Sequence, residues 1–211
     1  MTMELGLTDE EGAFLVKLAR KAIENYLLGH GKISPREEMP KKFLEKRGVF
    51  VTLNSMGPSG THTLRGCIGF PFPTLPLIDA VISSAIEAAV GDPRFPPVSY
   101  EEMDSIALEL SILTKPQEIL ERDRRGLPGL IKIGEDGLII ARGRYQGLLL
   151  PQVPVEWGWD AEEFLTQCCF KAGLPPDCWL MEGTRIYRFR AEIFCEERPR
   201  GPVIRRRLLP P

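Results

Sequence analysis

The chain is poor in the residues that most often build metal centres. Among 211 residues it has two histidines and five cysteines, and no two cysteines stand in the C-x-x-C spacing of a zinc site. The phosphate-binding P-loop, the G-x-G-x-x-G fingerprint, the G-x-S-x-G turn and H-E-x-x-H are absent as well. The sequence therefore predicts neither a metal site nor a bound cofactor, and it excludes several common enzyme classes.

Long apolar segments and an excess of positive charge are also absent. The longest apolar stretch, residues 75–90, is interrupted by Asp79, two serines and Glu87, so it cannot span a membrane. The formal net charge of −2 gives no overall attraction to nucleic acid. The first ten residues are acidic and lack the apolar core of a secretory signal. We therefore expect a cytoplasmic protein that associates with neither membranes nor nucleic acid.

Asparagine and glutamine are scarce, with six in all, whereas proline, arginine and glutamate are plentiful. This composition favours a thermophilic source, in which intracellular disulfides are tolerated. Cys168 and Cys169 fall on the apolar stripe of a predicted helix, so we expect them in the core. A disulfide with Cys178 is the minor alternative.

Helix and strand signals do not alternate regularly along the chain. Helices are predicted from the capping box at residues 8–11, at 40–46, at 74–90 and at 160–172. Strands are predicted at residues 49–54, 61–70, 105–114, 130–133, 138–142, 147–150 and 185–195. A doubly wound parallel sheet would need single strands alternating with helices. The sequence therefore predicts an α+β fold with a mixed or mainly antiparallel sheet flanked by helices.

Four local features refine this prediction. The strands at 49–54 and 61–70 are expected to form one hairpin, and those at 130–133 and 138–142 a second one. The strand at 105–114 alternates cleanly, which predicts one buried face. Prolines restrict residues 151–154 to the edge of a sheet or the exit from it. The Arg- and Pro-rich residues 196–211 are expected to be a loosely held tail.

The most informative segment is residues 64–69, which read L-R-G-C-I-G. In a regular strand Arg65 and Cys67 project from the same face, about 6–7 Å apart, while Leu64, Ile68 and Phe70 face the core. An arginine at that distance favours the thiolate and makes Cys67 more nucleophilic.

The two glycines of this segment, Gly66 and Gly69, permit a ligand or another backbone to approach closely. The alternative is that they mark a bulge and that Cys67 is a small buried residue of the core. His62 points away from Cys67 in a regular strand, so a nucleophile–base pair of these two residues needs a bulge between them.

Three other regions offer polar partners. Residues 92–97 form a proline-fixed loop in which Asp92 and Arg94 either hold a ligand or close a simple turn, with Phe95 in the core. Glu109 is either solvated or, if its face lines a cleft, a partner of Arg65. The segment with Gln152 and Glu156 either exposes its backbone for recognition or is an ordinary edge.

Five segments of the chain resemble, in order, segments of the AMMECR1 domain family. They are residues 48–53, 64–69, 92–98, 149–153 and 171–174, and the hexapeptide at 64–69 is the most specific of them. The resemblance covers about residues 8–195 and leaves 196–211 as a separate tail. It implies an α+β domain of two unequal subdomains, with the hexapeptide near the cleft between them.

The resemblance places Arg65, Gly66, Cys67 and Gly69 at the functional site. To these we add three ligand-binding candidates from neighbouring segments, Asp92, Arg94 and Gln152. The resemblance also implies a system in which this domain occurs beside, or fused to, Memo-like and radical SAM proteins.

Two functions remain open from the sequence. The first is an enzyme or enzyme component that acts in the cleft on a small anionic or carbonyl substrate, with Arg65 binding the anion and Cys67 as nucleophile or thiol donor. The second is a non-catalytic adaptor for a Memo-like or radical SAM partner. Nucleic-acid binding through the arginine-rich tail ranks last.

Overall fold

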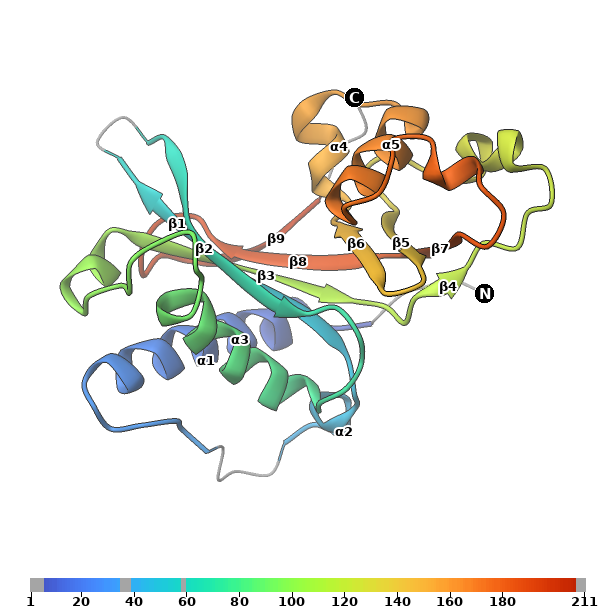
Figure 1. Ribbon diagram of the computed structural model, residues 1–211. Helices are drawn as coiled ribbons and strands as arrows, with labels where there is room; N and C mark the ends of the chain where they lie inside the picture. The colour runs from blue at the N-terminus through green and yellow to red at the C-terminus, as the bar shows by residue number, and fades with distance from the viewer. Residues whose placement is uncertain (1–5, 35–38, 58–59, 208–211) are drawn as a thin grey trace. The chain divides into compact units, whose positions relative to one another are not determined.

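A computed structural model describes residues 6–34, 39–57 and 60–207 of the chain (Figure 1). By its internal contacts the chain divides into two compact units. Of the described residues, the larger unit contains residues 6–113 and Glu192–Arg206, and the smaller unit contains Thr114–Ala191 and Arg207. Helices accompany two antiparallel sheets, one in each unit, which confirms the predicted α+β class.

The larger unit is built on a five-stranded sheet in the order β2-β1-β3-β8-β9. Its strands are β1 (Gly48–Met56), β2 (His62–Phe70), β3 (Ile106–Leu113), β8 (Ala191–Glu196) and β9 (Val203–Arg206). Its helices are α1 (Asp9–Leu27), α2 (Lys41–Leu44), α3 (Leu77–Val90) and the 3-10 turn η1 (Glu101–Asp104). Helices α1 and α3 lie side by side on the same face of this sheet (Figure 1).

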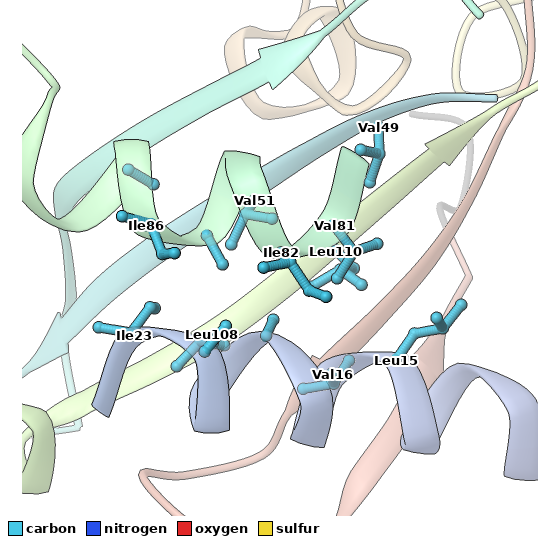
Figure 2. Packing of buried hydrophobic residues seen from close by; sticks show 14 of the residues in the cluster. Leu15, Val16, Ile23, Val49, Val51, Val81, Ile82, Ile86, Leu108 and Leu110 are labelled. Atoms are coloured by element: carbon cyan, nitrogen blue, oxygen red, sulfur yellow. The ribbon is translucent and has the colours of Figure 1, made fainter. Parts of the chain in front are cut away.

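Local signals explain why these elements form where they do. At the start of α1 the Thr8 hydroxyl accepts a hydrogen bond from the Glu11 amide, and the Glu11 carboxylate accepts one from the Thr8 amide, as the capping box predicts. Side chains of α1 and α3 then point toward β1 and β3 and bury one continuous apolar core (Figure 2). That core fixes the sheet that carries the hexapeptide.

One buried ion pair connects α1 to the end of strand β8. The Arg20 guanidinium donates to both carboxylate oxygens of Glu196, at 2.7 and 2.6 Å, and to the carbonyls of Met103 and Ile106. Glu196 also accepts from the Leu108 amide at 3.1 Å. Because every charge is matched inside the fold, removing one partner would leave the other buried and uncompensated.

The smaller unit has a four-stranded sheet in the order β4-β7-β5-β6. Its strands are β4 (Gln117–Glu118), β5 (Gly137–Arg142), β6 (Tyr145–Leu149) and β7 (Arg185–Phe189). Its helical segments are η2 (Arg124–Leu130), α4 (Gln152–Trp157), α5 (Ala161–Lys171) and η3 (Cys178–Leu180). The helix predicted at 160–172 is confirmed as α5, and the Asp160 side chain accepts from the Glu163 amide at its start.

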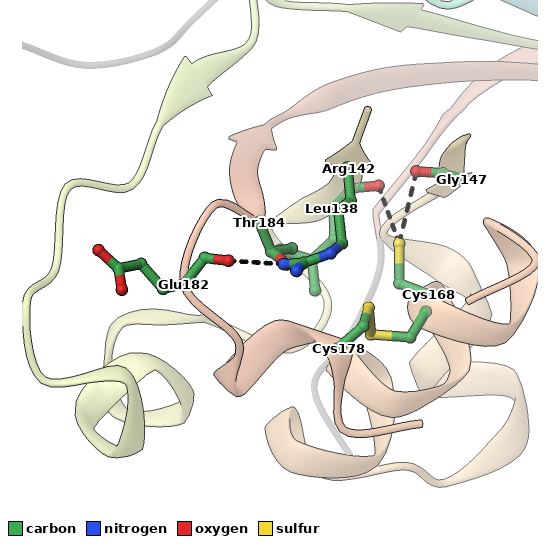
Figure 3. The surroundings of a disulfide bond; sticks show 8 residues. Leu138, Arg142, Gly147, Cys168, Cys178, Glu182 and Thr184 are labelled. Carbon is green, nitrogen blue, oxygen red and sulfur yellow. Dashed lines mark hydrogen bonds between the residues drawn. A yellow bond between two sulfur atoms is a disulfide. The ribbon is translucent and has the colours of Figure 1, made fainter. Parts of the chain in front are cut away.

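A disulfide joins Cys169 of α5 to Cys178 of η3 (Figure 3). Cys168 and Cys169 are both buried in the core, as predicted, and the disulfide that the sequence left as the minor alternative forms as well, through Cys169. Cys168 remains a free thiol in the core, where it donates weak hydrogen bonds to the carbonyls of Leu138 and Gly147.

The strand predicted at residues 130–133, and with it the predicted second hairpin, is wrong. Residues 130–133 form no strand because their amides are used in turns, for example Lys132 with the Asp136 carboxylate. The second hairpin is instead β5–β6. Residues 151–154 leave the sheet after β6 and begin helix α4, which agrees with the predicted exit from the sheet, because prolines fit the first turn of a helix, where amides have no helical partner.

The long strand predicted at 185–195 is split at Arg190 into β7 and β8, which belong to different sheets. At this point the Arg190 amide donates to the Thr114 hydroxyl and its carbonyl accepts from the Thr114 amide. The expected single buried face of β3 is also wrong, because all eight of its residues are buried.

The expectation of a loosely held tail is wrong for residues 203–206, which form β9 against β8. Arg205 donates to Asp9, to Glu192 and to the Leu7 carbonyl, so its charge is neutralised within the larger unit. Among the helices of the described ranges, none combines the length and apolar character that crossing a membrane requires.

Candidate functional site

The hexapeptide lies in β2, and a β-bulge interrupts its pairing with β1. Thr52 stands opposite Cys67 and Leu53 opposite Gly66, but the next pair is Asn54 with Leu64. Arg65 is therefore the extra residue of β2. Because the bulge inverts the alternation, Leu64 shares the face of Cys67 and is 38 % exposed, which corrects its predicted place in the core.

Arg65 is bound by the segment that follows α3. Its guanidinium donates to both carboxylate oxygens of Glu102, at 3.0 and 3.2 Å, and to the carbonyls of Pro96 and Pro97. The side chain is only 13 % exposed, and it lowers the pKa of Glu102 chiefly through these hydrogen bonds. Arg65 thus anchors this segment to β2.

Cys67 is half-buried, and its surroundings favour the thiol over the thiolate. Burial is the largest influence and raises its pKa, and the carboxylates of Asp92 and Glu109 add to this effect. A hydrogen bond from the Thr52 hydroxyl, at 3.3 Å, and the charge of Arg94 act in the opposite direction but are weaker. The predicted activation of Cys67 by Arg65 is therefore wrong, and the cation that influences this thiol is Arg94.

Asp92 connects Cys67 to Arg94. Its buried carboxylate accepts from the Cys67 amide at 2.8 Å and from the Arg94 side chain at 2.9 and 2.7 Å. The hydrogen bonds from the Arg94 side chain, together with those from the backbone amides of Cys67 and Arg94, hold the pKa of Asp92 well below its usual range. Arg94 also donates to the Cys67 carbonyl at 3.3 Å. Asp92 therefore binds the backbone amide of Cys67, and Arg94 binds its backbone carbonyl.

Two features of the 92–97 loop show the turn that the sequence predicted as one alternative, while ligand binding by Asp92 and Arg94 stays a prediction. The amides of Arg94 and Phe95 bond to the Asp92 side chain and carbonyl, so the segment is a closed turn. Phe95 is half-buried beneath the Arg94 guanidinium, which lies 5.4 Å from the ring centre, rather than in the core. The Arg94 side chain remains 51 % exposed and carries the charge that this turn displays.

Gly66 and Gly69 permit close approach of protein backbone. A Cβ atom at Gly66 would lie 2.1 Å from the carbonyl oxygen of Ala88 in α3. At Gly69 it would lie 2.2 Å from the Val49 carbonyl oxygen. Both positions therefore exclude any larger residue, and the close approach that the sequence predicted is made by neighbouring chain segments.

A polar row crosses the sheet beside the hexapeptide. Cys67 stands opposite Thr52 on β1, and Thr52 stands opposite Glu109 on β3. Glu109 is buried and accepts from Arg206 of β9 at 2.9 Å, so both its predicted solvation and its predicted pairing with Arg65 are wrong. No sequence pattern indicated this role for Arg206, because its strand lies in the expected tail.

Two candidates remain, His62 of β2 and Gln152 of the smaller unit. The bulge does bring His62 onto the face of Cys67, but their partners Met56 and Thr52 are four positions apart on β1, about 13 Å at the usual rise of a strand. That distance rules out a hydrogen-bonded dyad. Gln152 is buried at the start of α4 in the smaller unit, and its role in a site stays a prediction.

No group of three or more His, Cys, Asp or Glu side chains in the described part of the chain is arranged to hold a metal ion.

The family comparison then identifies the domain. The family model of AMMECR1 matches residues 16–194. The chain belongs to the AMMECR1 family.

Similar proteins of the AMMECR1 family come from thermophilic archaea, in agreement with the composition. The chain is 59 % identical over 203 residues to the protein PYRAB00100 of Pyrococcus abyssi, covering 96 % of this chain and 98 % of that protein. It is 57 % identical over 203 residues to the protein MJ0810 of Methanocaldococcus jannaschii, with the same coverage of both chains.

A solved structure gives the same fold. The crystal structure of the uncharacterized protein PH0010 from Pyrococcus horikoshii matches with a TM-score of 0.90 and 58 % identity, covering 96 % of this chain and 99 % of that chain.

Proposed function

We propose that this AMMECR1-family protein is a non-catalytic binding component of an enzyme system, which recognises a partner protein through the surface around Arg94 and Cys67. The partner that the family resemblance favours is a Memo-like or radical SAM protein. The observation that carries the proposal is which charged side chains of the hexapeptide and of the 92–97 turn are buried in contacts within the protein and which is exposed. Arg65 and Asp92 bind other parts of the same unit, which leaves Arg94 as the displayed charge.

Rigidity supports a recognition role. The Arg94 guanidinium is fixed by Asp92, by the Cys67 carbonyl and by the Phe95 ring, so little conformational freedom is lost when a partner carboxylate or carbonyl meets it. Fixed arginines are frequent among the residues that dominate binding energy at protein interfaces. The raised pKa of the Cys67 thiol supports binding rather than nucleophilic chemistry in the resting protein.

The test is a calorimetric titration of the purified protein, carried out separately with the Memo-like protein and with the radical SAM protein of the same organism. Arg94→Gln should weaken the binding at least about tenfold, as expected for an anchor arginine. Arg185→Gln is the matched control, because Arg185 is also an exposed arginine paired with one carboxylate, that of Glu118. Cys67→Ser should bind like the wild type.

Absence of binding to both proteins would overturn the choice of partner and leave the adaptor role without support. An equal loss for Arg94→Gln and Arg185→Gln would show that general charge, rather than this surface, drives association. Melting temperatures of both variants verify that each remains folded.

A second function is favoured by the polar row of Cys67, Thr52 and Glu109. Here the protein is an enzyme component that takes a small carbonyl or anionic substrate beside Cys67. The thiol sulfur would add to the carbonyl carbon while its proton passes to the carbonyl oxygen, which gives a hemithioacetal without any further reactant. Complementation of a deletion strain separates the two functions, because Cys67→Ala would fail if Cys67 acts covalently and would succeed for an adaptor.

A further inference from the structure

We propose a second binding site, along the side of α1 that carries Phe14, Lys17 and Lys21, for a small organic anion with an apolar body. A cavity of about 580 Å³ lies in the larger unit. It is lined by Phe14, Lys17, Leu18, Lys21 and Asn25 of α1 and by His30, Lys32, Ile33, Ser34 and Met39 of the segment that follows. This volume falls within the range of small-molecule sites, about 300–1,000 Å³.

The α1 residues that line the cavity form a separate stripe on the helix. Phe14, Leu18, Lys21 and Asn25 follow one another at intervals of four, three and four residues, and Lys17 lies three after Phe14 and four before Lys21, so all five share one side of α1. The neighbouring stripe, which includes Leu15, Ala19 and Ile23, is buried in the core. The fold uses this side of α1 only in part for packing, because Phe14 and Leu18 contact the core whereas Lys17 and Lys21 are exposed.

The charge of the lining is of one sign. It has three lysines and His30, and no carboxylate occurs among the described residues that line it. Lys17 and Lys21 are four positions apart on the helix, where like charges repel. Within the described residues neither of them forms an ion pair, although the chain as a whole has a net charge of −2. A bound anion would neutralise this cluster.

The opposite wall is held in place by specific contacts. The Asn25 side-chain amide donates to the Gly31 carbonyl at 2.7 Å, and the His30 amide donates to the Asn25 carbonyl. Gly29 and Gly31 both have positive φ, which allows the chain to turn back along α1. Lys32 donates to the Ser83 hydroxyl of α3 at 2.8 Å, so its ammonium group has a defined position.

The apolar part of the lining selects the body of the ligand. Phe14 is stacked on Phe43, with ring centres 5.5 Å apart, and offers a flat surface that is partly exposed. Leu18, Ile33 and Met39 are half-buried around it and pack against the core. A flat apolar group would rest on these side chains while a phosphate or carboxylate meets the lysines. Inorganic phosphate alone, or a neutral aromatic molecule, would use only half of the site.

Calorimetry with 2-naphthyl phosphate tests the proposal, with 2-naphthol and inorganic phosphate as the two halves of the probe. We expect 2-naphthyl phosphate to bind at least tenfold more tightly than either half. The double variant Lys17→Gln/Lys21→Gln should lose at least tenfold in affinity, whereas Lys115→Gln, at an exposed lysine of the smaller unit, should lose none. Met39→Ala should weaken 2-naphthyl phosphate but not inorganic phosphate.

Equal binding of 2-naphthol and 2-naphthyl phosphate would overturn the proposal, as would unchanged affinity in the double lysine variant or no binding at millimolar concentration. The lysines are exposed, so their replacement leaves the core intact and the melting temperature serves as the check. Arg94→Gln should leave this binding unchanged, which separates the site from the one proposed for a partner protein.

Discussion

The backbone amide of Cys67 donates a hydrogen bond to the Asp92 carboxylate at 2.8 Å, and this bond ties β2 to the turn that follows α3. The same carboxylate fixes the Arg94 guanidinium, which in turn bonds to the Cys67 carbonyl. A single buried acid therefore organises the middle of the hexapeptide and the residue displayed beside it.

Asp92→Asn should lower the free energy of unfolding by about 2 kcal/mol at pH 7, because hydrogen bonds to a charged group contribute roughly 1.5–3 kcal/mol. The pKa of Asp92 is depressed in the folded protein, so its contribution is complete above the unfolded pKa, about 3.9, and is lost as the pH falls toward the folded pKa. The difference between wild type and variant in urea unfolding should therefore shrink below about pH 4.

Glu118→Gln is the matched control for this experiment. The pKa of Glu118 is also lowered by an arginine, Arg185, but that pair is largely exposed. Exposed pairs contribute about 0–1 kcal/mol, so Glu118→Gln should change stability much less. Equal effects of the two substitutions would contradict the organising role of Asp92.

Cys67 should react slowly with iodoacetamide in the native protein. Its pKa is raised, chiefly by burial, so little thiolate is present near pH 7.5 and the midpoint of the rate against pH should lie above that of free cysteine, about 8.5. Site-resolved mass spectrometry measures each thiol separately. Cys168, whose burial raises its pKa to about 12, should react more slowly still.

Arg94→Gln should slow the labelling of Cys67 further, because the charge of Arg94 favours the thiolate. Rapid labelling of Cys67 with a midpoint below 8.5 would instead support the covalent enzyme.

Local signals in the sequence were sufficient for the larger unit's main elements. The capping box of Thr8 and Glu11 and the strand composition of residues 49–54 depend on neighbouring residues only, and both predictions are confirmed. The predicted place of Leu64 in the core failed because it depended on perfect alternation. The bulge at Arg65 arises from pairing with β1, which no pattern within residues 61–70 records.

The partners of the site residues were also beyond the reach of sequence patterns. Asp92 and Arg94 were predicted from the stiffness of their loop. Glu102 lies in a segment for which no site role was predicted, and Arg206 lies in the expected tail. Their roles follow from tertiary contacts, since Arg65 must neutralise its charge where the bulge directs it. Long-range ion pairs of this kind leave no periodic trace in a single sequence.

Gly66→Ala should destabilise the protein by at least about 2 kcal/mol. The added Cβ would lie 2.1 Å from the Ala88 carbonyl oxygen, so the backbones of β2 and α3 must move apart to admit it. Overpacking of a core usually costs about 1–3 kcal/mol, and a clash with backbone belongs to the upper part of that range. Gly126→Ala is the control, because a Cβ there meets nothing within 4 Å. Urea unfolding compares the two variants, and equal stabilities would show that α3 can move away from β2 at little cost.

The disulfide between Cys169 and Cys178 should be intact in the purified protein and should contribute to stability. Three thiols, those of Cys67, Cys168 and Cys195, should then titrate with Ellman's reagent in denaturant without reductant. The disulfide closes a loop with a sequence separation of 9, for which the chain-entropy estimate is about 2–3 kcal/mol. The double variant Cys169→Ser/Cys178→Ser should lose about that much in free energy of unfolding, whereas Cys195→Ser, at a half-buried free thiol, should lose less. Five titrating thiols would show that the pair is reduced, and the double variant would then report only the loss of two buried sulfur atoms.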